Sequence, residues 1–264
     1  MKSPSPLMEA SVENHTGHRV MIATDIEDYS SRNRDDQATL QRDLVRALDH
    51  AAGLARLGLL DWRRQEQGDG QFVVLPPGTD AVTVLTSFVT ELNEVLTGYN
   101  SAMSRMRMRL SVHEGPVVLD GANGVPGAHA VQTNRLVNAA ALKAAMKARQ
   151  EANLGVIVSD RMFEDYVGQC HGGPSKDDFR RVEVAEKKER YIAHIHLPGH
   201  NVHALGNLIG PGEPAPQGQP PTVPASAGRD LAMNDMIKVK GGGSANTAQG
   251  DIHIGSPNRK GRPR

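Results

Sequence analysis

Between residues 19 and 198 the sequence changes repeatedly between short apolar runs and longer stretches with helical periodicity. The first run, residues 19–26, is rich in branched side chains and has polar flanks, which predicts a buried strand. A helical pattern follows over about residues 35–56, with apolar side chains along one face. Because each pattern needs a partner to cover its apolar side, this succession limits the chain to a few layered folds.

The later patterns are of the same two kinds. They predict a hairpin, a helix, a bent strand, a further helix, a strand with a short helix, and a closing hairpin. In chain order these are residues 59–67 with 71–76, 79–96, 106–119, 135–149, 155–159, and 179–186 with 190–197. The order βαββαβ followed by further αβ elements predicts an α+β fold with a ferredoxin-like core. Its helices are expected to pack on one face of a mostly antiparallel sheet.

The two ends of the chain differ from this middle part. Residues 1–18 are polar, which predicts a disordered lead-in. From residue 199 Pro and Gly are frequent and large apolar side chains are rare, so residues 199–264 are predicted to form a disordered tail. A short apolar run at residues 230–240 is either part of this linker or a peptide that docks on a partner protein.

Composition excludes several classes of protein. The formal net charge is zero, so no overall field favours nucleic acid or an anionic membrane. Cys170 is the single cysteine, which rules out an intrachain disulfide and fits a reducing cytoplasm. No stretch is apolar for long enough to span a membrane or to act as a secretion signal. Aromatic residues make up only 3% of the chain, so the core must be aliphatic.

Two aspartates stand where the predicted strands end. Asp25 closes the first strand, and Asp69 lies between Gly68 and Gly70 in the predicted hairpin turn. Each has an ordinary explanation, since aspartate caps helices and Asp-Gly is a common turn. In a βαββ arrangement, however, both can lie on adjacent central strands. Two carboxylates meeting there would repel each other unless a divalent cation such as Mg²⁺ lay between them.

Three basic residues are candidates for binding phosphate. Arg135 is expected to open a helix after a glycine-containing loop, and arginine binds phosphate with two hydrogen bonds. A solvated helix residue is an equally good explanation of this position. Lys187 and Lys188 lie between the last two predicted strands, where a charged hairpin turn is the ordinary interpretation.

These segments resemble the catalytic domain of the class III adenylate/guanylate cyclases, in a divergent form common in actinobacteria. ATDIEDYS, residues 23–30, is similar to the strand-end metal motif of the family, and QGDGQFVVLP, residues 67–76, to its hairpin with the second metal carboxylate. MRLSVHEGPV, residues 108–117, matches the bent strand of the family. GVPGAHAVQTNRLVNAAALKAA, residues 124–145, matches its last motif. The resemblance covers residues 19–198.

The resemblance implies an activity and a set of roles. The ribose 3′-hydroxyl of a nucleoside triphosphate would attack the α-phosphorus and release pyrophosphate. Two Mg²⁺ or Mn²⁺ ions would bind Asp25, Asp69 and the backbone carbonyl of Ile26. Arg135 would stabilise the developing charge, and Lys187 or Lys188 would hold the terminal phosphates. The family shares each site between two subunits, so a homodimer is implied.

Three positions depart from the family pattern. One is the second base-reading position, which falls in the loop GANGVPG, residues 121–127, and offers no clear polar side chain. Val131 stands where the family has an asparagine that orients the ribose, and Gln65 stands at a position that contacts the base, beside Gly68 and Gly70 of the turn. The sequence therefore supports two hypotheses. One is an intracellular nucleotide cyclase, active or weakly active, whose base preference is unassigned, with a pyrimidine as one option because of Gln65. The other is a degenerate pseudo-cyclase, a dimeric nucleotide-binding module whose tail recruits a partner.

Overall fold

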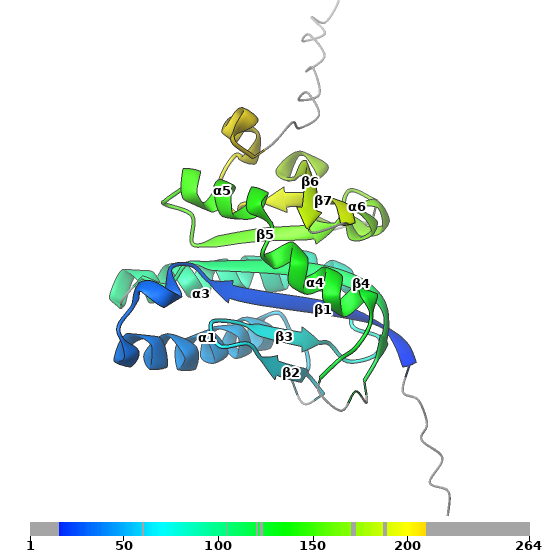
Figure 1. Cartoon of the computed structure of the whole chain (residues 1–264), viewed down its shortest axis with the longest axis horizontal. Helices are drawn as coiled ribbons and strands as arrows, with labels where there is room; N and C mark the ends of the chain where they lie inside the picture. The colour runs from blue at the N-terminus through cyan, green and yellow to red at the C-terminus, as the bar shows by residue number, and fades with distance from the viewer. Residues whose placement is uncertain are drawn as a thin grey trace, which may run out of the picture. The chain divides into compact units, whose positions relative to one another are not determined.

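The computed structural model describes residues 16–209, apart from residues 60, 104, 120, 122, 123, 170–172, 187 and 188. The elements alternate between strands and helices over this range (Figure 1). They are β1 (Thr16–Ile26), η1 (Tyr29–Ser31), α1 (Arg34–Leu54), β2 (Arg63–Glu66), β3 (Gln71–Val74), α2 (Ala81–Thr83), the π-helical turn η2 (Val84–Phe88), α3 (Val89–Ala102), β4 (Met108–Val118), α4 (Ala128–Val137), α5 (Ala140–Ala148), β5 (Leu154–Ser159), α6 (Asp160–Tyr166), η3 (Lys176–Asp178), β6 (Arg180–Glu186), β7 (Glu189–His196) and η4 (Val202–Ile209).

The seven strands form one sheet in the order β2-β3-β1-β4-β5-β7-β6. All neighbouring strands are antiparallel except β4 and β5, which are parallel. The first four strands, with α1 and α3 between them, have the βαββαβ order and the β2-β3-β1-β4 arrangement of a ferredoxin-like core. The predicted α+β class, the core and the mostly antiparallel sheet are therefore confirmed.

The helices cover both faces of the sheet, not one face as the sequence predicted. Ile22 and Val112 point to the face packed by α1, α3 and α6, in one core that is mostly aliphatic. Met21 and Phe72 point to the opposite face, where they pack with α4. Ile157 also lies on that second face and packs with α5 and η4. The side chains in the middle of β1, residues 20–23, are all buried because both faces are covered.

The single helix predicted over residues 135–149 is two helices. α4 ends at Val137 and α5 begins at Ala140, with Asn138 closing the first helix. The break lets the two segments pack on different strands: α4 lies over β1 and β4, while α5 packs with β5 and η4 (Figure 1). Arg135 is therefore in the last turn of α4 and does not open a helix.

Regular elements reach beyond the predicted domain limits of residues 19 and 198. β1 begins at Thr16, three residues before the predicted start. Val202, Leu205 and Ile209, placed in the tail by their Pro- and Gly-rich surroundings, are buried against α5 and β6 in η4. The remainder of the predicted tail, including residues 230–240, lies outside the described residues. Among the described helices, none combines the length and the apolar composition that a membrane span requires.

Removing η4 should destabilise the domain. A chain that ends at residue 198 loses the burial of Val202, Leu205 and Ile209, each worth about 1.5–3 kcal/mol when fully buried. We expect it to unfold at a temperature at least several degrees below that of a chain ending at residue 209, as measured by circular dichroism. Equal midpoints for the two truncated chains would show that η4 contributes nothing to stability.

Three hydrogen-bonded polar side chains lie on the second face of the sheet; His113 and Ser159 are buried and His129 is partly buried. His113 on β4 forms a 2.8 Å hydrogen bond with the Ser159 hydroxyl and another of 2.8 Å with His129 on α4. Ser159 also caps α6, since its side chain accepts a hydrogen bond from the Met162 backbone. Burial lowers the pKa of His113 to about 4, and protonated His129 and the charge of Arg161 contribute to this lowering. His113 is therefore neutral in the folded protein at neutral pH.

This histidine makes the fold sensitive to acid. The unfolded state binds a proton near pH 6.5 and the folded state only near pH 4, so stability falls as pH decreases through this interval. The full effect is about 3 kcal/mol. Urea unfolding at pH 7, 6, 5 and 4 should show this loss, and a His113→Gln variant, which has no proton to gain, should lose less over the same interval. An identical pH dependence in both proteins would contradict the assignment.

Candidate functional site

The candidate site lies where β1 and β4 meet at one end of the sheet. Asp25, near the end of β1, is directly opposite Arg109 in the strand register, and their side chains form an ion pair. Both side chains are largely buried, with 13% of Asp25 and 10% of Arg109 exposed. The Nε–H group of Arg109 is buried as well and has no hydrogen-bond acceptor among the described residues. Within the described part of the chain, one donor of this guanidinium is therefore buried without a hydrogen-bond partner beside Asp25.

The turn between β2 and β3 carries Asp69 to the same place. The backbone N–H of Ile26 donates a 2.9 Å hydrogen bond to the carbonyl oxygen of Asp69, so the two carboxylate residues lie on adjoining segments. Gly70 allows this approach, because a β-carbon there would overlap the carbonyl oxygen of Thr24. Gly68 has a positive φ of 77°, a conformation that glycine adopts without strain. The two glycines thus have separate steric roles.

Side-chain hydrogen bonds hold the turn on both sides. The Thr24 hydroxyl accepts a 3.1 Å hydrogen bond from the Gln71 backbone N–H, across the junction of β1 and β3. On the helix side, the Gln41 amide of α1 donates a 2.7 Å hydrogen bond to the Gly68 carbonyl. Asp69 therefore extends from a turn that is fixed to both the central strand and α1.

The electrostatics of Asp25 show two opposed influences. Burial raises the pKa of this carboxyl above its ordinary value, while the hydrogen bond and the charge of Arg109 lower it. The carboxylate of Asp69 raises the pKa again, and the more distant Lys143 lowers it. Asp25 and Asp69 thus repel each other, and positive charge near them is favourable.

Arginine and lysine residues supply positive charge on this side of the sheet. Arg107, two positions from Arg109, forms an ion pair with Glu27 and donates hydrogen bonds to backbone carbonyl oxygens at and just after the end of α5. It thereby fixes the helix that carries Lys143. Neither Arg109 nor Lys143 was among the residues predicted from the sequence. The signal available for Arg109 was a charged residue inside a strand whose neighbours, residues 108–112, are otherwise apolar or small.

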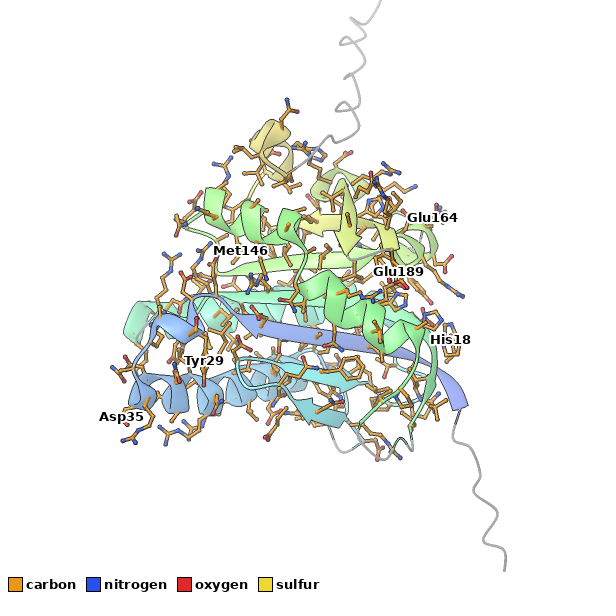
Figure 2. All side chains as sticks on the ribbon, viewed as in Figure 1. His18, Tyr29, Asp35, Met146, Glu164 and Glu189 are labelled. Carbon is orange, nitrogen blue, oxygen red and sulfur yellow. The ribbon has the colours of Figure 1, made fainter. Side chains whose placement is uncertain are left out.

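Arg135 is held elsewhere. From the last turn of α4 it forms an ion pair with Glu189 and donates a hydrogen bond to the hydroxyl of Tyr191, both on β7. The register, followed from Arg109 across β5 to β7, puts Tyr191 about six strand positions further along the sheet, roughly 20 Å at about 3.3 Å per residue. Figure 2 shows Glu189 towards one end of the sheet and Tyr29, just after β1, towards the other. A single chain does not bring Arg135 to the two aspartates.

The other predicted site residues are distributed as follows. Gln65 lies on β2, and a β-carbon on Gly124 would overlap its amide, so Gln65 lies against the loop before α4. Val131 is on α4 with 46% of its surface exposed. Lys187 and Lys188 lie outside the described residues.

The carboxylates of Asp25 and Asp69 supply only part of the ligands that a hard divalent cation needs. Two neighbouring carboxylates suit Mg²⁺ or Mn²⁺ when phosphate oxygens supply further ligands. Among residues 16–209, as far as they are described, no group of three or more His, Cys, Asp or Glu side chains is arranged to hold a metal ion by itself. The repulsion between Asp25 and Asp69 is the feature that a cation would relieve.

Comparison with known proteins gave matches only among solved structures. A scan against protein-family models and a search of curated proteins found no match. The guanylyl cyclase Cya2 has a TM-score of 0.49 at 13% identity, over 69% of this chain and 93% of that one. An adenylate/guanylate cyclase/hydrolase from Silicibacter pomeroyi has a TM-score of 0.49 at 17% identity, over 70% and 99%. The guanylate cyclase domain of RhGC from Catenaria anguillulae, in complex with GTP, has 0.46 at 13%, over 68% and 95%.

All three solved structures are cyclases or cyclase domains. Their TM-scores lie below 0.5, so the likeness assigns neither a family nor an activity to this chain. The fold described above rests instead on the strand order and register of the chain itself.

Replacing Gly70 by alanine should displace the Asp69 turn. The added β-carbon would overlap a backbone oxygen, which cannot rotate away, so we expect a loss of about 1–3 kcal/mol in the free energy of unfolding by urea. Gly98→Ala is the matched control: this glycine is inside α3, a β-carbon on it would meet nothing within 4 Å, and alanine there should not destabilise. Equal stability of Gly70→Ala and the parent protein would rule out the close approach.

Proposed function

We propose that this chain is a class III nucleotide cyclase-like protein, which forms a 3′,5′-cyclic nucleotide and pyrophosphate from a nucleoside triphosphate in intracellular, cytoplasmic signalling. The observation that carries this proposal is the meeting of Asp25 and Asp69 beside Arg109. A structural role alone explains the Asp25–Arg109 pair, but it does not explain a second carboxylate held next to it by Gly70 and Thr24.

Each residue of this site has a separate role in the proposal. Asp25, Asp69 and the carbonyl of Ile26 would hold Mg²⁺ or Mn²⁺, which when bound supplies Lewis-acid activation and neutralises the triphosphate. Arg109, paired with Asp25, would keep positive charge beside the phosphates. Gly68 and Gly70 have no side chains, so they would let a nucleotide approach the backbone of the turn. Gln65 would contact the base of the nucleotide.

The separation of Arg135 from the aspartates supports a site shared between two copies of the chain. Roughly 20 Å of sheet lies between Arg109 and the Tyr191 position that holds Arg135. A head-to-tail homodimer would bring Arg135 of one copy to the aspartates of the other, where it would stabilise charge developing on the phosphate. Lys187 and Lys188 remain candidates for binding the terminal phosphates.

The exposed side chain of Val131 favours a second candidate function. It lies on α4, four residues before Arg135, and has no group that could form a hydrogen bond with a ribose. Without such a contact the chain would bind a nucleotide and turn it over slowly or not at all. The alternative is therefore a dimeric pseudo-cyclase that binds nucleotide and recruits a protein partner through its tail.

The deciding experiment is incubation with Mn²⁺ or Mg²⁺ and each of the four nucleoside triphosphates, followed by chromatography of the products. We expect one cyclic nucleotide with pyrophosphate, and a rate at least ~10²-fold lower for Asp25→Asn, because positioned electrostatic groups contribute on this scale. Asp35→Asn, at the exposed start of α1, is the control and should match the parent. Absence of a cyclic product with every triphosphate would exclude the cyclase; nucleotide binding that Asp25→Asn/Asp69→Asn abolishes would then support the alternative.

A mixture of Asp25→Asn and Arg135→Ala proteins tests the shared site. Random pairing gives heterodimers with one intact site, so we expect about a quarter of the parent activity, whereas each variant alone should be inactive. An inactive mixture, from proteins that are dimeric by light scattering, would show that the two residues do not act across an interface.

A further inference from the structure

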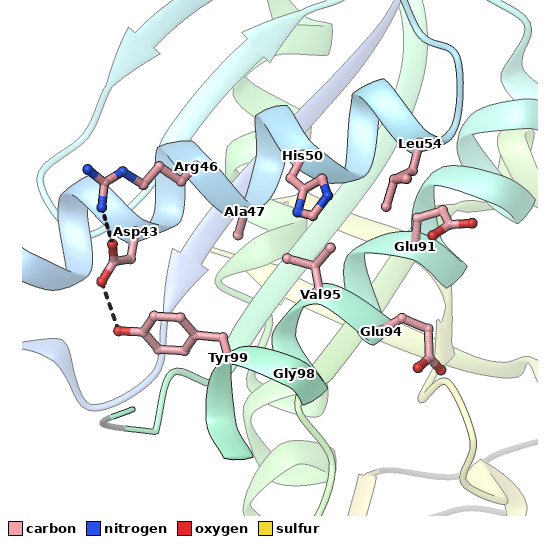
Figure 3. A pocket seen from close by; sticks show the side chains of 10 residues that line it. All are labelled: Asp43, Arg46, Ala47, His50, Leu54, Glu91, Glu94, Val95, Gly98 and Tyr99. Carbon is pink, nitrogen blue, oxygen red and sulfur yellow. Dashed lines mark hydrogen bonds and ion pairs between the residues drawn. The ribbon is translucent and has the colours of Figure 1, made fainter. Parts of the chain in front are cut away.

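A groove on the side of the sheet opposite α4 supports an inference that does not depend on nucleotide binding. It lies between α1 and α3, which run side by side, and has a volume of about 520 Å³ (Figure 3). One wall extends along α1 from Asp43 to Leu54 and the other along α3 from Glu91 to Tyr99. At 1.5 Å per residue these walls are about 16 Å and 12 Å long, which matches two to three turns of a helix.

The middle of the groove is lined by small and apolar side chains together with the imidazole of His50 (Figure 3). Ala47 on α1 and Gly98 on α3 leave room for a backbone to approach, with Val95 between the helices (Figure 3). Leu54 at one end has 50% of its surface exposed and adds apolar area to the lining. The lining therefore suits the apolar face of an amphipathic helix.

No contact among the described residues requires glycine at position 98. Gly98 is inside α3, where glycine costs about 1 kcal/mol of helix stability relative to alanine. A β-carbon built on it meets nothing within 4 Å, so packing within the domain leaves room for a side chain there. The close approach of a partner molecule's backbone is a physical reason for glycine at such a position.

The charges on the rim indicate which kind of partner fits. Among the residues that line the groove, the three carboxylates of Asp43, Glu91 and Glu94 outnumber the basic groups, which are the guanidinium of Arg46 and the imidazole of His50. Asp43 is already engaged, since it binds Arg46 at 3.2 Å and accepts a 2.9 Å hydrogen bond from Tyr99. Glu91 and Glu94 have no ion-pair partner among the described residues. They form an acidic rim that favours basic side chains and disfavours an anionic membrane.

We propose that the groove between α1 and α3 is a docking site for a basic amphipathic helix of a partner protein. The apolar side of the helix would lie over Ala47, Val95 and Gly98, with Leu54 covering one end. Lysine or arginine side chains of the helix would face the two glutamates of the rim.

The probe for this site is a synthetic, fluorescently labelled peptide of about twelve residues, with leucines on one helical face and lysines beside them. We expect saturable binding by fluorescence anisotropy. Gly98→Leu, which fills the groove and replaces a helix-destabilising glycine, should weaken binding at least tenfold. Glu91→Lys/Glu94→Lys should do the same by reversing the charge of the rim.

Three controls separate docking from general attraction. Gly53→Leu adds the same side chain to α1, where a β-carbon also meets nothing within 4 Å and the residue does not line the groove. Asp35→Lys/Glu164→Lys makes the same change in charge at exposed sites elsewhere (Figure 2). Both should bind like the parent, and a peptide with glutamate in place of lysine should not bind.

The opposite results would overturn the proposal. Equal weakening by the two charge-reversal pairs would show non-specific attraction, and full binding by Gly98→Leu would show that the peptide is not in the groove. A failure of the peptide to bind, together with a change of oligomeric state in Gly98→Leu by light scattering, would identify the groove as an interface between copies of this chain. None of these measurements uses nucleotide, so they fail or succeed separately from the proposed cyclase function.

Discussion

The ion pair between Asp25 and Arg109 is the interaction on which the candidate site depends. Both groups are largely removed from water, which costs several kcal/mol for each charge unless the partner is in place. The pairing of β1 with β4 puts them directly opposite each other, so the sheet register itself provides the partner. With Asp69 added, the site has two carboxylates and one guanidinium, and the remaining positive charge must come from outside this group.

The two faces of the sheet contain different features. Asp25 and Gln65 share the face under α4 by their register, and Arg135 lies on α4 itself. The face under α1 and α3 contains the larger aliphatic core, and the outer side of these two helices forms an acidic groove. Gln41 links the α1 side to the candidate site: it lies on α1, and its amide donates a hydrogen bond to the Gly68 carbonyl oxygen in the turn that contains Asp69.

The sequence predicted the central part of the fold and the meeting of the two aspartates. Residues 19–26 form a short apolar run rich in branched side chains, which favours a buried strand, and a βαββ order allows the Gly-Asp-Gly turn to return to it, as the β1–β3 pairing shows. The later helices were predicted less well. The apolar pattern resumes directly after Asn138, so the pattern alone predicts one helix; the helix ends at Asn138 and its two parts pack on different strands. Arg109 looks like an ordinary strand residue until its partner across β1 is known, and the distance between Arg135 and Asp25 depends on strand register, which a residue pattern does not contain.

The long pairing of β1 with β4 also has a consequence for how the protein folds. Its eleven register positions, from Thr16 with Val118 to Ile26 with Met108, join residues about 80 to 100 positions apart. Closing such a loop has an entropic cost that local contacts do not offset. We therefore expect this pairing to form more slowly than the helices and the β2–β3 hairpin. The two halves of the buried ion pair can meet only after that closure, so the site cannot form before this long-range pairing is in place.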